Sequence, residues 1–206
     1  MPEPRGRLGG VAVLGFRPHT YWTAAVALVG PPDAPHVVER RRIDFAAGDE
    51  RSVYHQAEEL GGDEAAAEAL IARVWTAVLA NATRGVGDLA RDLAARGFTL
   101  GVAVAPIGRG KQPDRLADVL KSHSHIHAAE GDFYRAVVAQ ACADVGLEVR
   151  RAVERDLAAL VCRRFQLDAL AVDTYLSLLR TALGPPWTED QKLATLAAWS
   201  GMEEAG

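Results

Sequence analysis

Apolar and polar positions follow two different patterns along the chain, and the first of them predicts strands. Gly10–Phe16 is a continuous apolar run, which is typical of a strand buried on both faces. We expect residues 17–20 (RPHT) to interrupt it before a second strand over Tyr21–Val29, which ends at a Gly/Pro-rich turn. A third strand, His36–Phe45, carries the charges expected of a sheet edge. The short links between these strands predict an antiparallel meander.

The pattern becomes helical after the meander. Residues 52–97 are rich in Ala, Glu and Arg, with apolar residues at helical spacing, and predict one or two long helices. A break is expected at Gly85-Val86-Gly87, because each interior glycine costs about 1 kcal/mol relative to alanine. Two more strands are predicted, at Phe98–Ile107 and Leu147–Val153. The other predicted helices are a short one from Asp114, a long one over Ser122–Val145, a two-part region over Glu154–Leu183, and a final helix capped by Thr188 with Gln191.

This order of elements predicts an α/β fold of the RNase H-like class. Right-handed crossovers place the last two strands parallel to the first, which gives a five-stranded mixed sheet of order 3-2-1-4-5 with helices on both faces. We expect a single domain over residues 1–206, with 1–9 and 201–206 flexible. Ligands of such sheets bind off the carboxyl ends of the parallel strands. Arg17, the loop after the fourth strand and the start of the long helix are therefore expected to converge there.

The long helix over Ser122–Val145 carries the most unusual chemistry. His123, His127 and Glu130 project onto the same face as its apolar residues, stacked one turn apart. Ionisable groups on a core-facing stripe need partners, so the sequence predicts a site at the N-terminal end of this helix. Three further histidines are interpreted as hydrogen-bonded core residues: His36, His55 and His125.

Two segments resemble the RuvC-type Holliday-junction resolvases of the RNase H-like superfamily. The first is Gly15-Phe16-Arg17-Pro18-His19-Thr20, followed by an alternating strand, which resembles the strand-turn-strand opening of that family. The second is Asp190-Gln191-Lys192-Leu193-Ala194-Thr195-Leu196-Ala197-Ala198, which resembles its final helix. The resemblance implies a site of four carboxylates that holds two divalent metals for phosphodiester cleavage.

The sequence departs from that carboxylate pattern at most positions. Arg17 stands at the first-strand position, residues 106–108 (PIG) offer no acid after the fourth strand, and Leu193 stands where the second helix carboxylate is expected. Asp190 alone matches. The resemblance therefore implies a degenerate nuclease site, and we expect no two-metal cleavage.

Three interpretations of the site remain open. Arg17 forms bidentate pairs with Glu130 or Asp190 in a non-catalytic site. Alternatively, one divalent transition metal is bound by His123, His127, Glu130 and Asp190. Or the histidines and Arg17 hold an anion such as phosphate. The candidate ligand-binding residues are Arg17, His19, Lys111, His123, His127, Glu130 and Asp190, and the candidate catalytic residues are His127, Glu130 and Asp190.

The favoured function is a non-catalytic module that binds a nucleic acid or a protein. The alternative is a divergent metal-dependent phosphodiesterase that uses the His/Glu/Asp cluster. No organic cofactor is indicated, and a divalent metal is the one cofactor considered. The basic loop Gly108-Arg109-Gly110-Lys111 lacks the length and the Ser/Thr of a P-loop, and Arg40-Arg41-Arg42 is interpreted as a solvated sheet edge.

Composition limits the partners and the compartment. The 206 residues carry a formal net charge of −4, which argues against indiscriminate, charge-driven binding to nucleic acids. Cys142 and Cys162 each lie in an apolar helical pattern and are expected to be buried free thiols in a reducing compartment. The first ten residues lack a signal-peptide apolar region, and we expect no run long enough to span a bilayer. A cytoplasmic protein without membrane contact is expected.

Overall fold

Five strands form one mixed sheet in the computed structural model, which describes residues 10–48, 51–108 and 110–203. The strands are β1 (Val11–His19), β2 (Trp22–Val29), β3 (His36–Asp44), β4 (Thr99–Ile107) and β5 (Glu148–Val153). Their order is β3-β2-β1-β4-β5, with β1, β2 and β3 antiparallel to their neighbours in the meander and with β4 and β5 parallel to β1. The predicted order and strand directions are confirmed.

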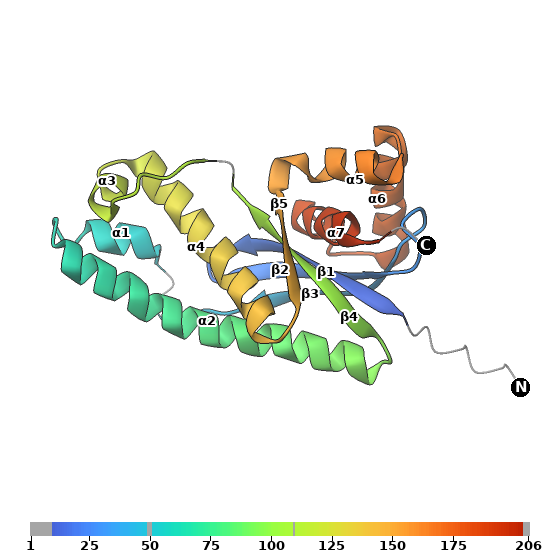
Figure 1. Ribbon diagram of the computed structural model, residues 1–206, viewed down its shortest axis with the longest axis horizontal. Helices are drawn as coiled ribbons and strands as arrows, with labels where there is room; N and C mark the ends of the chain where they lie inside the picture. The colour runs from blue at the N-terminus through green and yellow to red at the C-terminus, as the bar shows by residue number, and fades with distance from the viewer. Residues whose placement is uncertain (1–9, 49–50, 109, 204–206) are drawn as a thin grey trace, which may run out of the picture.

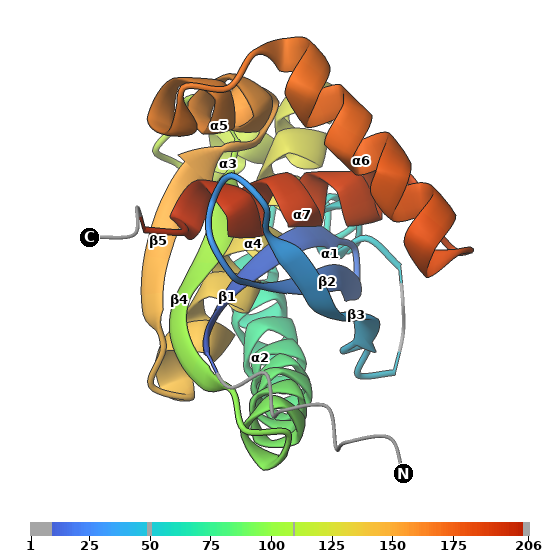
Figure 2. The same cartoon turned by 90° about the vertical axis from the view of Figure 1, so that its right-hand side faces the viewer.

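Helices cover both faces of this sheet (Figures 1 and 2). One layer contains α1 (Val53–Glu58), α2 (Glu64–Ala95), α3 (Leu116–Leu120) and α4 (His123–Asp144). After the short 3₁₀ turn η1 (Glu154–Asp156), the other layer contains α5 (Leu157–Phe165), α6 (Ala169–Leu183) and α7 (Glu189–Gly201). The predicted capping box of α7, Thr188 with Gln191, is present. Each layer therefore shields one face of the central strands from water.

Alternation along β1 divides the apolar core into two parts. Leu14 and Phe16 pack on the side of α2 and α4, whereas Val13 packs on the side of α7. β2 is buried from Thr23 to Val29, because it lies inside the sheet between both layers.

The first hairpin is tighter than the sequence pattern predicted. β1 does not stop at Arg17 but continues to His19, pairing Arg17 with Ala24 and Pro18 with Thr23. Pairing between β1 and β4 extends only to Gly15, so β1 beyond that point has a neighbouring strand on one side and tolerates a proline. The predicted interruption is wrong, and His19 therefore belongs to the strand.

The helical break also lies elsewhere than predicted. α2 runs without interruption through Gly85-Val86-Gly87, and the break falls at Gly61 and Gly62, whose positive φ angles of 67° and 95° end the preceding turn. A Cβ on Gly85 would lie 2.3 Å from Ile43 Cγ2, so the glycine allows α2 to approach β3 closely. Its packing role outweighs its weak helix propensity.

The two chain ends differ in what the structure describes. Residues 1–9 and 204–206, which the sequence predicted to be flexible, lie outside the described residues. Residues 201–203 do not form the flexible start of a tail: Gly201 completes α7, and Met202 is 4% exposed within the core.

By length and composition alone, α2 matches a membrane-spanning helix. An 18-residue window has a mean hydropathy of 1.2, contrary to the expectation that no run is long enough. The same helix contributes Val78, Val86 and Leu89 to the core beneath the sheet. Only 17% of the window is buried inside the protein, and one such helix is weak evidence for a membrane span.

The two cysteines are expected to differ in reactivity. Cys142 is fully buried, and desolvation raises the pKa of its thiol to about 12, whereas Cys162 is only partly buried. Because the thiolate is the reactive form, a disulfide reagent at pH 8 should modify Cys162 and leave Cys142 unmodified until the protein unfolds. Counting modified thiols by mass before and after denaturation checks this, with Cys162→Ala as the control. Equal modification of both native thiols would contradict it.

Candidate functional site

Arg17 lies at the carboxyl edge of the sheet and pairs with a residue that the sequence did not suggest. Its Nε is 3.4 Å from Glu154 Oε2, and its Nη1 donates to the Pro18 carbonyl oxygen at 2.8 Å. Glu154 begins η1 directly after β5, whose carboxyl end lies at the same edge. The predicted partners, Glu130 and Asp190, are therefore wrong. The pair is partly accessible, with side chains 21% and 22% exposed.

Asp190 is hydrogen-bonded to the histidine at the end of β1. His19 Nε2 lies 2.6 Å from Asp190 Oδ1, at the start of α7. The His19 ring stacks on Trp22 with a centroid distance of 4.1 Å and an interplanar angle of 6°. The Arg42 guanidinium lies 4.0 Å from the Trp22 ring centroid. The rings of His19 and Trp22 and the guanidinium of Arg42 thus form one column, which begins two residues after Arg17 on β1.

Glu130 has a structural role on the opposite face of the sheet. Its buried carboxylate accepts hydrogen bonds from Ser52 Oγ (2.8 Å), the Val53 N–H (3.1 Å) and the Tyr54 N–H (3.0 Å). These are the donors at the beginning of α1, so Glu130 caps that helix from α4. Burial together with the Glu130 charge raises the pKa of the Tyr54 phenol.

The four predicted metal ligands are consequently not assembled. Glu130 lies in the layer of α2 and α4, whereas Asp190 lies in the layer of α7. The prediction that both carboxylates meet two imidazoles around Arg17 is wrong, because the sheet separates the two helices. A helical projection identifies a face of α4, but it does not show which layer that face contacts.

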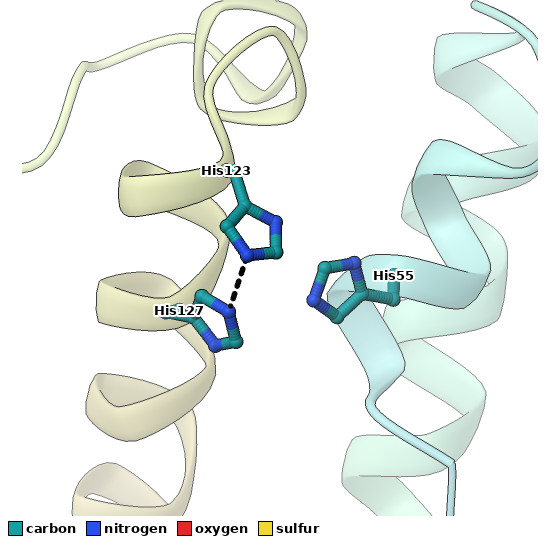
Figure 3. A group of neighbouring side chains, drawn as sticks. All are labelled: His55, His123 and His127. Carbon is teal, nitrogen blue, oxygen red and sulfur yellow. Dashed lines mark hydrogen bonds between the residues drawn. The ribbon is translucent and has the colours of Figure 1, made fainter.

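Two of the predicted histidines do come together, with a third that the sequence interpretation set aside. His123 and His127 are exposed rather than core-facing, and their Nε2 atoms lie 2.9 Å apart. His55 of α1 faces both, at ring-centroid distances of 5.2 Å (Figure 3). We call His55, His123 and His127 the histidine cluster. No local signal connects α1 with α4, so only their packing reveals His55.

The remaining candidates lie outside these two sites. His36 is exposed, so its interpretation as a core residue is wrong. His125 is half-buried. Arg40 is not solvated but donates to the Leu183 and Gly184 carbonyl oxygens at the end of α6. Lys111 is exposed, and Arg109 lies outside the described residues.

A separate groove lies among α2, α3 and α4. Its volume is 660 Å³, and its walls include Trp75, Phe133 and Tyr54, with Glu68 and Asp132 at polar positions. The groove shares no residue with the histidine cluster, and Gln112 and Pro113 of the loop after β4 line part of it.

Comparison with known proteins relates the fold to resolvases. No family model and no curated protein matches the sequence. Among solved structures, the chain is similar to Thermus thermophilus RuvC in complex with a Holliday junction substrate, with a TM-score of 0.52, 9% identity, and coverage of 92% of this chain and 91% of RuvC. The chain is also similar to a second Thermus thermophilus RuvC structure, with a TM-score of 0.51, 9% identity and coverage of 92% of both chains. The fold is RNase H-like and resembles that of RuvC. At 9% identity this similarity shows the fold alone.

Proposed function

We propose that the protein is a non-catalytic nucleic-acid-binding module built on a RuvC-like fold. The observation that carries the proposal is Arg17 at the end of β1, in an ion pair with Glu154. By the resemblance of the β1 segment, this is where resolvases place their first metal-binding carboxylate. A guanidinium there repels a divalent cation, yet it offers the bidentate donors that suit a phosphate.

The neighbouring groups support binding rather than cleavage. Asp190, the one matching carboxylate, is hydrogen-bonded to His19, and residues 106–108 contribute no acid. His19 and Trp22 add aromatic surface of the kind that contacts bases, and Arg42, in an ion pair with Asp44, adds a guanidinium beside it. A nucleic acid is favoured over a protein partner because the similar RuvC structure contains a Holliday junction substrate.

Cleavage assays test the non-catalytic part of this proposal. The purified protein with Mg²⁺ or Mn²⁺ should leave a four-way DNA junction and a linear duplex of the same sequence uncut, because the acids for two-metal catalysis are missing. Product formation is followed on denaturing gels. Cleavage that disappears in Asp190→Asn or His127→Ala would contradict the proposal and favour the divergent phosphodiesterase.

Binding assays test the nucleic-acid part. Fluorescence anisotropy with the same labelled junction should show binding that weakens as salt rises. Arg17→Gln should reduce the affinity roughly 5-fold or more, as expected for a lost phosphate contact. Arg91→Gln on α2 removes the same charge from an exposed site in the other layer and serves as the control. No binding by the wild type, or equal losses in both variants, would contradict a nucleic-acid site at Arg17.

A further inference from the structure

The histidine cluster has the donor set and the spacing of a transition-metal site. His123 and His127 are four residues apart, so they lie on one face of α4, and the two Nε2 atoms are 2.9 Å apart. The three ligand atoms of the cluster all lie within 4.8 Å of one another. In tetrahedral zinc sites with Zn–N bonds of about 2.0–2.1 Å, the nitrogens are separated by roughly 3.4 Å. Small side-chain rotations therefore convert the observed cluster into a coordinating one.

Glu58 orients the third histidine. His55 Nδ1 lies 3.2 Å from Glu58 Oε2, one turn further along α1. A carboxylate on one ring nitrogen fixes the tautomer, leaves the other nitrogen to bind a metal, and raises its basicity. Figure 3 shows the His55 ring directed towards the other two rings. The Glu58–His55 pair therefore matches the carboxylate–histidine part of the carboxylate–histidine–metal arrangement of many metalloproteins.

The helices that carry the three ligands are held together independently of any metal. Glu130 of α4 lies one turn beyond His127. Its carboxylate accepts hydrogen bonds from the first backbone N–H groups of α1 and from the Ser52 hydroxyl. This cap fixes the N-terminus of α1 against α4, which limits how far His55 moves from its two partners. Ligands on packed helices are more precisely placed than ligands on loops.

We propose that His55, His123 and His127 form a binding site for one divalent transition metal of the zinc class. Three imidazole nitrogens favour Zn²⁺, Co²⁺ or Ni²⁺ over Mg²⁺ and Ca²⁺, which prefer oxygen. His123 and His127 are exposed and His55 is half-exposed, so the fourth coordination position faces solvent and takes water or an anionic ligand. The site differs from the metal set expected from the sequence, and it is independent of the proposed nucleic-acid site, which lies in the other layer.

Metal titrations of untagged, chelator-treated protein test the site. Calorimetry with Zn²⁺ should show one ion per chain, Co²⁺ should give the visible absorption of a four-coordinate complex, and Zn²⁺ should raise the melting temperature where Mg²⁺ does not. His55→Ala and, as an independent second variant, His123→Ala should each lower the Zn²⁺ affinity about 100-fold or more. Glu58→Gln should lower it roughly 10-fold, as expected for an outer-shell partner.

His36→Ala is the matched control, because it removes an exposed histidine of β3 that lies outside the cluster. It should bind Zn²⁺ as the wild type does. His123→Ala should melt at the wild-type temperature without metal, since its exposed ring contributes little to packing. Substoichiometric Zn²⁺ binding by the wild type, or wild-type affinity in His55→Ala, would overturn the proposal.

Discussion

Gly15→Ala is expected to prevent α7 from packing on the sheet, and this should be the largest single effect in the chain. An added Cβ would lie 2.1 Å from the Ala194 carbonyl oxygen and 2.2 Å from the Ala198 nitrogen. Both atoms belong to the α7 backbone, which cannot relieve the clash by changing a side-chain rotamer. The cost should exceed the roughly 1–3 kcal/mol of ordinary overpacking.

Urea unfolding followed by circular dichroism measures this cost, or shows that the variant no longer folds cooperatively. Gly10→Ala is the control, because nothing lies within 4 Å of its added Cβ. It should change stability by less than about 0.5 kcal/mol, as surface substitutions usually do. A Gly15→Ala protein as stable as the Gly10→Ala protein would show that α7 does not lie against β1 as described.

Glu130→Ala is expected to destabilise the protein by about 3 kcal/mol. The substitution removes a buried acceptor of three hydrogen bonds and leaves the Val53 and Tyr54 amides without their partner. Buried donors that lose a charged acceptor cost about 1–3 kcal/mol each, although the start of α1 will relax towards water and recover part of the loss. The effect should be concentrated at α1 and its contact with α4.

Urea unfolding gives the total loss, and amide hydrogen exchange shows where it falls. The Val53 and Tyr54 amides should lose protection in Glu130→Ala, whereas amides of the central strands should retain it in proportion to global stability. Glu68→Ala, which removes an exposed carboxylate from α2, is the charge-matched control and should be nearly neutral. Unchanged protection at α1 would contradict the capping role of Glu130.

The sequence by itself determined the order, type and pairing of most elements. The apolar run of β1, the charged edge strand β3 and the capped helix α7 each carry their own periodicity, and crossover handedness then allows one sheet order. The local sequence pattern predicted the wrong ends for helices and strands where tertiary packing compensates for a residue with weak helix or strand propensity. Gly85 sits inside α2 because Ile43 approaches it, and the β1 strand passes through Pro18 because β4 no longer pairs there.

Only the tertiary structure decided which charged groups meet. A helical projection placed His127 and Glu130 on one face of α4, but it contained no information on the sheet that separates Glu130 from Asp190. Arg17 meets Glu154, and His55 meets His123, because side chains far apart in sequence come within a few ångströms after packing. Periodicity is set by neighbours along the chain, whereas ion pairs and metal ligands depend on how separate elements pack.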